Sequence, residues 1–368
     1  MSYYHFLLMG GIINSKIIKV MGLFYCLLFA VSVTGSEREF PLCPILSSKL
    51  DALSYSMGES FVFSKGVASI WLNPSRMGHE RHITFGVLYE KRNEEQGFWN
   101  DDISGILQII GITYPRSKIT FGLSYSVPYD MEMHLDCDHY STILKNFSIG
   151  CELRTSDRLS IGGTLGILWG NSLEEDIWRE FKSTVKGLQG SFGLSWKHSP
   201  HIETGLIIRT PFFLKGKCEE DYSGPNFWNG YGDTTFTKVF SIDDKLFYPI
   251  TAIGISIHPC ESFAFNTQLT YKYFSLDGTG FFWGNNEIDL NLGGNWDFNN
   301  LLSLRFGGYV MLFPSPESEF DNTVAITTGL GIKLPSGSID IAVGYGESAD
   351  INYLYGRNPV LLDMTLNF

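Results

Sequence analysis

Residues 359–368 read PVLLDMTLNF, and this stretch decides the fold. Apolar side chains occupy every second position, namely Val360, Leu362, Met364, Leu366 and Phe368. The positions between them carry Pro, Leu, Asp, Thr and Asn. Alternation of this kind has the period of a β-strand, whose successive side chains point to opposite faces. The stretch therefore predicts a strand with one apolar face and one mixed, mostly polar face.

The same alternation returns many times upstream, with Gly, Ser, Thr and Asn as the usual residues of the second face. It is clear in residues 119–127, 263–273 and 324–332. Counting these stretches gives about 14 strands between residues 82 and 368. A bulky apolar face opposite a small hydrophilic face is typical of strands that separate lipid from a polar lumen. A soluble all-β domain would instead bury one face of each strand in a shared core.

The connections between the expected strands alternate between short and long. The short turns are residues 115–117, 155–156, 199–200, 259–261, 297–300 and 335–337. Longer segments lie between them, and the longest runs from Thr210 to Phe247. Outer-membrane barrels place short turns on the periplasmic side and long loops outside. We therefore expect an all-β, transmembrane antiparallel barrel over residues 82–368 in a bacterial outer membrane.

Composition agrees with this reading. Charged residues make up 18% of the 368 residues and aromatic residues 15%, and the chain holds 39 glycines. After residue 36 no apolar run reaches the roughly 18 residues that a membrane helix needs. The net charge of −12 and the absence of a basic stripe argue against nucleic acid as a partner.

The first 36 residues predict a signal peptide. Lys16 and Lys19 precede an apolar run at 20–33, and Thr34-Gly35-Ser36 offers small residues for cleavage. An uncleaved anchor helix is the alternative, for which the run is short. Export through this segment leaves residues 37–81 ahead of the first strand.

Residues 37–81 lack clean alternation but contain two short motifs. Residues 57–63 read MGESFVF, and residues 68–75 read ASIWLNPS. This pair resembles the N-terminal motif of the FadL-like superfamily, which includes the FadL and TodX transporters. Ser75 stands where the family usually has Ala, and Ser64-Lys65 stands where paired aspartates are frequent. The first half is most similar to the short PorV/PorQ-type members.

The resemblance implies that residues 37–81 fold inside the barrel as a plug, or hatch. The motif residues Met57, Gly58, Phe61, Asn73 and Pro74 then belong to the hatch. The physics agrees, because a barrel of about 14 strands is too wide for its own side chains to fill. Asn73-Pro74 can also be read as an ordinary turn.

For function, the resemblance implies passive transport of hydrophobic small molecules across the outer membrane, with the hatch shifting to open a path. Pro128 is expected to end the third strand and to weaken pairing beside a sideways opening. The alternative is a PorV/PorQ-type, non-enzymatic component of type IX secretion or surface attachment, with secreted proteins as partners. A general porin is a third reading.

The C-terminal residues Met364, Leu366 and Phe368 resemble the signal that the barrel-assembly machinery reads. That machinery and outer-membrane lipid are therefore expected partners.

Two loop clusters are weighed as binding sites. His134, Asp136, Cys137, Asp138 and His139 combine ligand types that suit a transition metal, although their spacing fits no established motif. A disulfide from Cys137 to Cys218 is a rival use. Tyr222, Phe227, Trp228 and Tyr231 lie in the longest loop and can offer an aromatic surface to a ligand, or pack on other loops.

Catalytic motifs are missing from the sequence, so we expect no enzyme and no cofactor. Ser256 and His258 share a strand without forming a recognised pattern.

Overall fold

The structure is a computed structural model of the chain. It describes residues 51–78, 80–93, 101–135, 138–175, 178–210, 213–225, 233–244, 250–273, 286–312, 323–347 and 357–367. The chain divides into two compact units, Met1–Gly35 and Ser36–Phe368, and all described residues lie in the second. Within these ranges, no helix has the length and apolar character needed to cross a membrane.

Within the described ranges, four short helical elements come first and sixteen strands follow. The helical elements are α3 (Ala52–Ser56), η2 (Phe61–Phe63), α4 (Ala68–Trp71) and η3 (Pro74–Arg76). The first eight strands are β1 (His82–Asn93), β2 (Asp101–Arg116), β3 (Ile119–Leu135), β4 (Asp138–Ser156), β5 (Leu159–Glu175), β6 (Arg179–Ser199), β7 (Ile202–Arg209) and β8 (Phe213–Pro225). The other eight are β9 (Asp233–Asp244), β10 (Ile250–Cys260), β11 (Phe263–Tyr273), β12 (Asn286–Asp297), β13 (Leu302–Leu312), β14 (Thr323–Leu334), β15 (Gly337–Glu347) and β16 (Arg357–Asn367).

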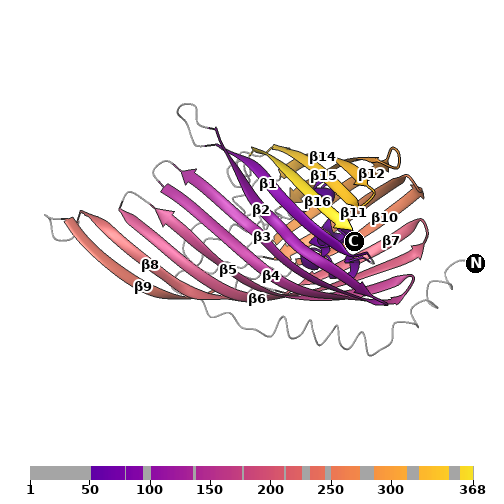
Figure 1. The fold of residues 1–368 in the computed structure, drawn as a ribbon. Coiled ribbons are helices and arrows are strands. Elements are labelled where there is room, and N and C mark those ends of the chain that lie inside the picture. Colours follow the sequence, from indigo (N-terminus) through magenta and orange to yellow (C-terminus); the bar gives the residue numbers. More distant parts are fainter. Residues whose placement is uncertain are drawn as a thin grey trace, which may run out of the picture. The chain divides into compact units, whose positions relative to one another are not determined.

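Fourteen of the strands close into an antiparallel barrel. The first and last strands meet, because Phe85 of β1 pairs with Met364 of β16 as well as with Ile110 of β2. Figure 1 shows this junction as the contact of the indigo and yellow strands. The ring continues through β7 directly to β10. The expected barrel of about 14 strands is confirmed.

The expected long loop from Thr210 to Phe247 is wrong in part, because it contains the hairpin β8–β9. Strand β6 is long enough to pair with two partners, with β7 along Ser191–Ser199 and with β8 along Arg179–Leu188. The outward residues Lys215, Lys217 and Glu219 of β8 are charged and exposed. Lipid-facing strands carry apolar residues outward, so the hairpin extends beyond the apolar band. It was not predicted from the sequence because its strands lack an apolar outer face.

The two faces of the ring strands are as the alternation predicts. Phe121, Leu123 and Ile149 point outward and are 44–56% exposed. Their neighbours Ser124 and Ser148 point inward and are buried. Because water would not stabilise an exterior this apolar, the barrel is a transmembrane one.

Aromatic side chains mark one edge of the apolar exterior. Tyr114, Trp196 and Trp296 are each 45% exposed, and each lies close to a short turn. Girdles of this kind sit where a barrel leaves the membrane. We call this the short-turn end of the barrel and the opposite one the long-loop end.

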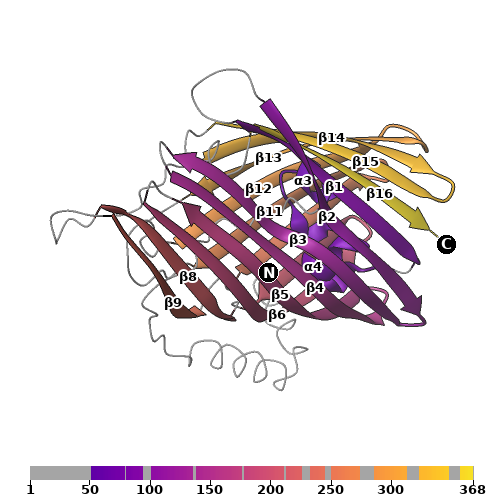
Figure 2. The same cartoon turned by 60° about the vertical axis from the view of Figure 1, so that its left-hand side comes forward.

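The four helical elements lie inside the ring (Figure 2). Element α3 contacts β13 to β16, η2 contacts β7 and β10, α4 contacts β3 and β4, and η3 contacts β4 to β6. The segment thus touches opposite walls, which confirms a plug. We call the described part, residues 51–78, the hatch. The expected bounds of 37–81 stay a prediction, since residues 37–50 lie outside the described ranges.

Candidate functional site

The hatch rests in a socket of wall glycines. A Cβ added at Gly162 would overlap the backbone of Pro74, and one added at Gly293 would overlap that of Met57. Eleven strands contribute such a glycine, namely Gly111, Gly122, Gly150, Gly162, Gly193, Gly205, Gly254, Gly293, Gly307, Gly329 and Gly344. Hatch atoms therefore approach the wall more closely than any side chain would allow. This arrangement accounts for much of the high glycine content.

Asn73 and Ser75 lock one side of the hatch. The Asn73 Nδ2 donates to the carbonyl of Val62 at 2.6 Å, and its Oδ1 accepts from the Ser75 amide and hydroxyl at 3.2 and 2.8 Å. The Ser75 hydroxyl lies 2.7 Å from that of Ser195 on β6. Pro74 begins η3, where a missing amide proton is harmless. These contacts support a structural role for Asn73-Pro74, and Ser75 bonds the wall as Ala would not.

The first motif locks the other side. Gly58 has φ of +67°, which glycine adopts without strain. Its amide donates to the hydroxyl of Thr327 at 2.9 Å, and its carbonyl accepts from Asn291 at 2.8 Å. The amide Nδ2 of Asn266 lies 3.3 Å from the Met57 sulfur, and Phe61 is buried. Both motifs thus bind hatch to wall.

Inward side chains are polar at the short-turn end of the lumen, which we call the lower lumen. Glu203 of β7 forms an ion pair with Arg76 of the hatch, and Glu152 accepts from the Gly78 amide at 3.0 Å. The positive charge of Arg76, followed by enclosure in the protein, lowers the pKa of Lys65 to about 8. Ser256 and His258 also lie here, with Oγ and Nε2 3.0 Å apart.

Toward the long-loop end the same strands turn apolar side chains inward. We call this set the apolar lining. Its members are Ile109, Val127, Leu144, Leu168, Val185, Ile207, Ile250, Ala252, Tyr309 and Met311. All but Val127 belong to one buried cluster that also contains Val67, Ile70 and Trp71 of the hatch. The upper lumen is therefore an apolar surface whose floor is the hatch.

Arg209 lies among the apolar lining, which also has polar neighbours such as the buried ion pair of Lys272 and Asp289. Its Nη2 donates to the Trp71 carbonyl at 2.9 Å, and the guanidinium lies 4.7 Å from the centre of the Trp71 ring. Arg209 is 4% exposed, and its Nε lacks a hydrogen-bond partner. In the described part of the chain no carboxylate lies within ion-pair distance of it. A buried, uncompensated cation can hold the acceptor end of a ligand.

The wall divides beside the apolar lining, between β2 and β3. Their pairing runs from Arg116↔Ile119 only as far as Ile109↔Ser126. Beyond that point β2 pairs with β1 alone and β3 with β4 alone (Figure 1). We call this point the fork. Both strands carry a bulge there, and Ile109 and Val127 of the apolar lining lie beside it.

Pro128 lies in the bulge on β3 but does not end the strand, so that expectation is wrong. Strand β3 continues to Leu135 because its pairing with β4 resumes at Tyr129↔Leu144. A bulge accommodates the residue that lacks an amide donor. The pairing that β3 loses near Pro128 is its pairing with β2.

The remaining candidate residues are only partly described. Tyr222 lies in β8, not in a loop, with Arg179 5.9 Å from its ring centre. Phe227, Trp228 and Tyr231 lie outside the described ranges. Met364 and Leu366 lie on the lipid face, and Phe368 is also outside. As a ligand surface and an assembly signal, these residues stay predictions.

The proposed metal cluster is divided between two strands. His134 of β3 pairs in register with His139 of β4, and Leu135 pairs with Asp138. Asp136 and Cys137 are not described, and the ranges that are described contain no group of three or more metal-ligating residues. Cys218 is a buried free thiol on β8.

Comparisons with known proteins place the fold. No family model and no curated protein matches the sequence. Among solved structures, the CymD monoaromatic hydrocarbon channel matches with a TM-score of 0.71 at 14% identity, covering 86% of this chain and 97% of its own. The toluene transporter TodX of Pseudomonas putida matches at 0.63 and 11%, covering 86% and 97%. A FadL homologue of Pseudomonas aeruginosa matches at 0.60 and 13%, covering 86% and 98%. The FadL-like fold is thus confirmed, whereas closeness to PorV/PorQ-type members stays a prediction.

Proposed function

We propose that this chain is a bacterial outer-membrane channel for the passive movement of small hydrophobic molecules. One observation carries the proposal: an apolar lining lies above a sealed hatch and reaches the wall at the fork between β2 and β3. A general porin would need a polar path along the barrel axis. Here the hatch and the glycine socket occupy that path.

The arrangement favours a sideways exit. Apolar surface is stabilised by about 25 cal/mol per Å² on leaving water, so a hydrophobic molecule would enter the apolar lining from the long-loop end. Ile109 and Val127 would then guide it to the fork, where β2 and β3 no longer bond each other. Lipid lies directly outside. The hatch would serve as a floor that directs the molecule sideways.

The printed descriptions of CymD as a monoaromatic hydrocarbon channel and of TodX as a toluene transporter support this class of cargo. Arg209 narrows it. A buried guanidinium with no carboxylate partner among the described residues favours molecules with an apolar body and one acceptor or carboxylate end. We infer that such amphipathic molecules pass more readily than plain hydrocarbons.

Uptake by whole cells tests the proposal. Cells expressing the chain should take up a labelled medium-chain fatty acid faster than vector controls. The variant Val127→Asn places a polar group beside the fork and should slow uptake, whereas Thr184→Asn, at an exposed position of β6, should not. Uptake no faster than in controls would contradict the proposal. Copurification of a secreted protein in its place would favour the secretion role.

A further inference from the structure

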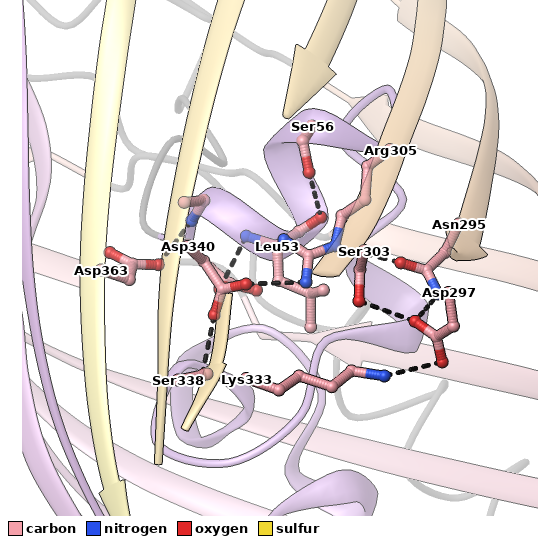
Figure 3. A network of polar contacts seen from close by, with 12 residues as sticks. Leu53, Ser56, Asn295, Asp297, Ser303, Arg305, Lys333, Ser338, Asp340 and Asp363 are labelled. Atoms are coloured by element: carbon pink, nitrogen blue, oxygen red, sulfur yellow. Dashed lines mark hydrogen bonds and ion pairs between the residues drawn. The ribbon is translucent and has the colours of Figure 1, made fainter. Parts of the chain in front are cut away.

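Buried carboxyl groups join the hatch to the last strands of the barrel. Asp51 begins α3, where its side chain accepts from the amides of Leu53 and Ser54, both at 3.2 Å. Asp363 on the inner face of β16 accepts from the Ala52 amide at 2.6 Å (Figure 3). Asp51 is 6% exposed and Asp363 4%. Hatch and wall thus present their carboxyl groups to each other inside the protein.

Asp363 and Asp51 accept from three consecutive amides, those of residues 52, 53 and 54, so the two buried carboxyl groups lie beside the same turn of α3. Two carboxyl groups placed in this way can hold one proton between them. Without the proton, two negative charges would meet in a site shielded from water. Like charges so close disfavour ionisation of both groups.

In the part of the chain that the structure describes, the pair has no free counter-ion nearby. Among the elements that pack against α3, β13 contributes Arg305, β15 contributes Asp340 and β14 contributes Lys333. Arg305 binds Asp340 at 2.7 Å, and Lys333 binds Asp297 at 2.8 Å (Figure 3). Element η2 carries no charged residue. Both cations are therefore occupied by other carboxylates, and Asp340 adds a third acid.

We propose that the proton shared by Asp51 and Asp363 is a latch that seats the hatch against β16, and that its loss at higher pH loosens α3 from the wall. The proposal goes beyond the proposed function, because it concerns the seating of the hatch whatever molecule passes. The latch holds only one side of the hatch. On the other side, Asn73 and Ser75 hold the hatch through neutral groups.

The direction of the pH effect on hatch seating follows from which form binds the proton more tightly. Burial raises the pKa of the Asp51 carboxyl; a hydrogen bond from Ser64 opposes this rise, and the charge of Asp340 adds to it. In a released hatch the carboxyl meets water and its pKa returns to about 4. The seated form therefore binds the proton more tightly. Seating is strongest at low pH and weakens as pH rises from about 4 through the raised pKa.

Amide hydrogen exchange of residues 51–57 tests the latch in the full-length protein in detergent. In Asp363→Asn the side-chain amide donates to Asp51 permanently, and Asp51→Asn keeps a good helix cap while removing its charge. At about pH 8.5 both variants should exchange about tenfold more slowly than wild type, and at about pH 5 within about twofold of it. Comparing proteins at one pH cancels the intrinsic pH dependence of exchange.

Asp157→Asn is the matched control, because it removes an exposed carboxylate from the turn between β4 and β5, at the same end of the barrel. It should follow wild type at both pH values. The latch is refuted if neither variant differs from wild type at the higher pH, or if each differs equally at both. Should one variant fail to fold, shown by an unshifted band on an unboiled gel, the other decides. Because uptake is not measured, the result is independent of the proposed function.

Discussion

The lower and upper parts of the lumen are built from the same strands and yet differ in character. Below, inward Ser, Thr, Asn and acidic residues bond the hatch, and glycines let its backbone touch the wall. Above, the same inner faces carry many Ile, Val and Leu residues. They also carry the buried ion pair of Lys272 and Asp289, and Arg209, which has no carboxylate within ion-pair distance among the described residues. The lower lumen is a polar joint, while the apolar lining of the upper lumen packs against Val67, Ile70 and Trp71 of the hatch.

This contrast teaches that sealing and binding are separate tasks in the barrel. Polar contacts in a low-dielectric interior are strong only when every group is satisfied, which suits a joint that stays closed. An apolar surface binds by area and demands little geometry, which suits passing molecules of varied shape. Hence substitutions in the lower lumen should affect folding, and substitutions in the upper lumen should affect uptake.

The largest expected effect comes from filling the socket. Gly162→Leu would drive a side chain into the backbone of Pro74 and should lower stability by more than about 3 kcal/mol. Gly163→Leu is the matched control, since Gly163 is exposed on the outer face and a Cβ there meets nothing closer than 3.7 Å. Urea unfolding followed by gel band shift would measure both. Equal stability of the two variants would break the comparison.

Much of this architecture could be predicted from the sequence, because a β-strand shows itself by apolar residues at every second position. Alternation with period two located all fourteen ring strands and assigned residues such as Met364 to the lipid face. The hairpin β8–β9 was missed because its outward residues are charged, so it lacks the apolar face that identifies a strand in lipid. Pro128 was expected to end the third strand, but β3 continues with β4 and loses only β2 there. Sequence does not show which neighbour a bulged strand keeps.

The candidate site was harder to predict from the sequence. Arg209 follows the apolar residues Leu206, Ile207 and Ile208, and its inward position could have identified it. Asp363 was placed correctly on the inner face, but its partner Asp51 lies 312 residues away in the sequence. Contacts of that separation depend on how the hatch docks, which no local pattern encodes. The wall glycines that contact the hatch could be recognised in the sequence only as a high total glycine content.

A smaller effect should follow from changing the upper lumen. Arg209→Met removes the buried cation and should slow uptake of a labelled fatty acid by about tenfold or more, because a charge-assisted hydrogen bond contributes about 1.5–3 kcal/mol. Uptake of labelled toluene should change by less than about twofold, since it makes no such bond. Lys215→Met, which removes an exposed cation from β8, is the control. Equal loss for both molecules would show that Arg209 acts only through the hatch.

The smallest effect tests whether the lower lumen is stabilised by its enclosed contacts in particular. Lys333 and Asp297 form an ion pair at 2.8 Å, but their side chains are 43% and 31% exposed. The pair of Arg305 with Asp340 has a similar length, 2.7 Å, and is 7% and 11% exposed. Water screens the first pair, so Lys333→Met should change the free energy of unfolding by less than about 1 kcal/mol. Arg305→Met leaves Asp340 buried without its partner and should reduce stability by several-fold more. Urea unfolding of both variants measures this difference, and equal losses would mean that enclosure by the hatch adds nothing to the contacts it covers.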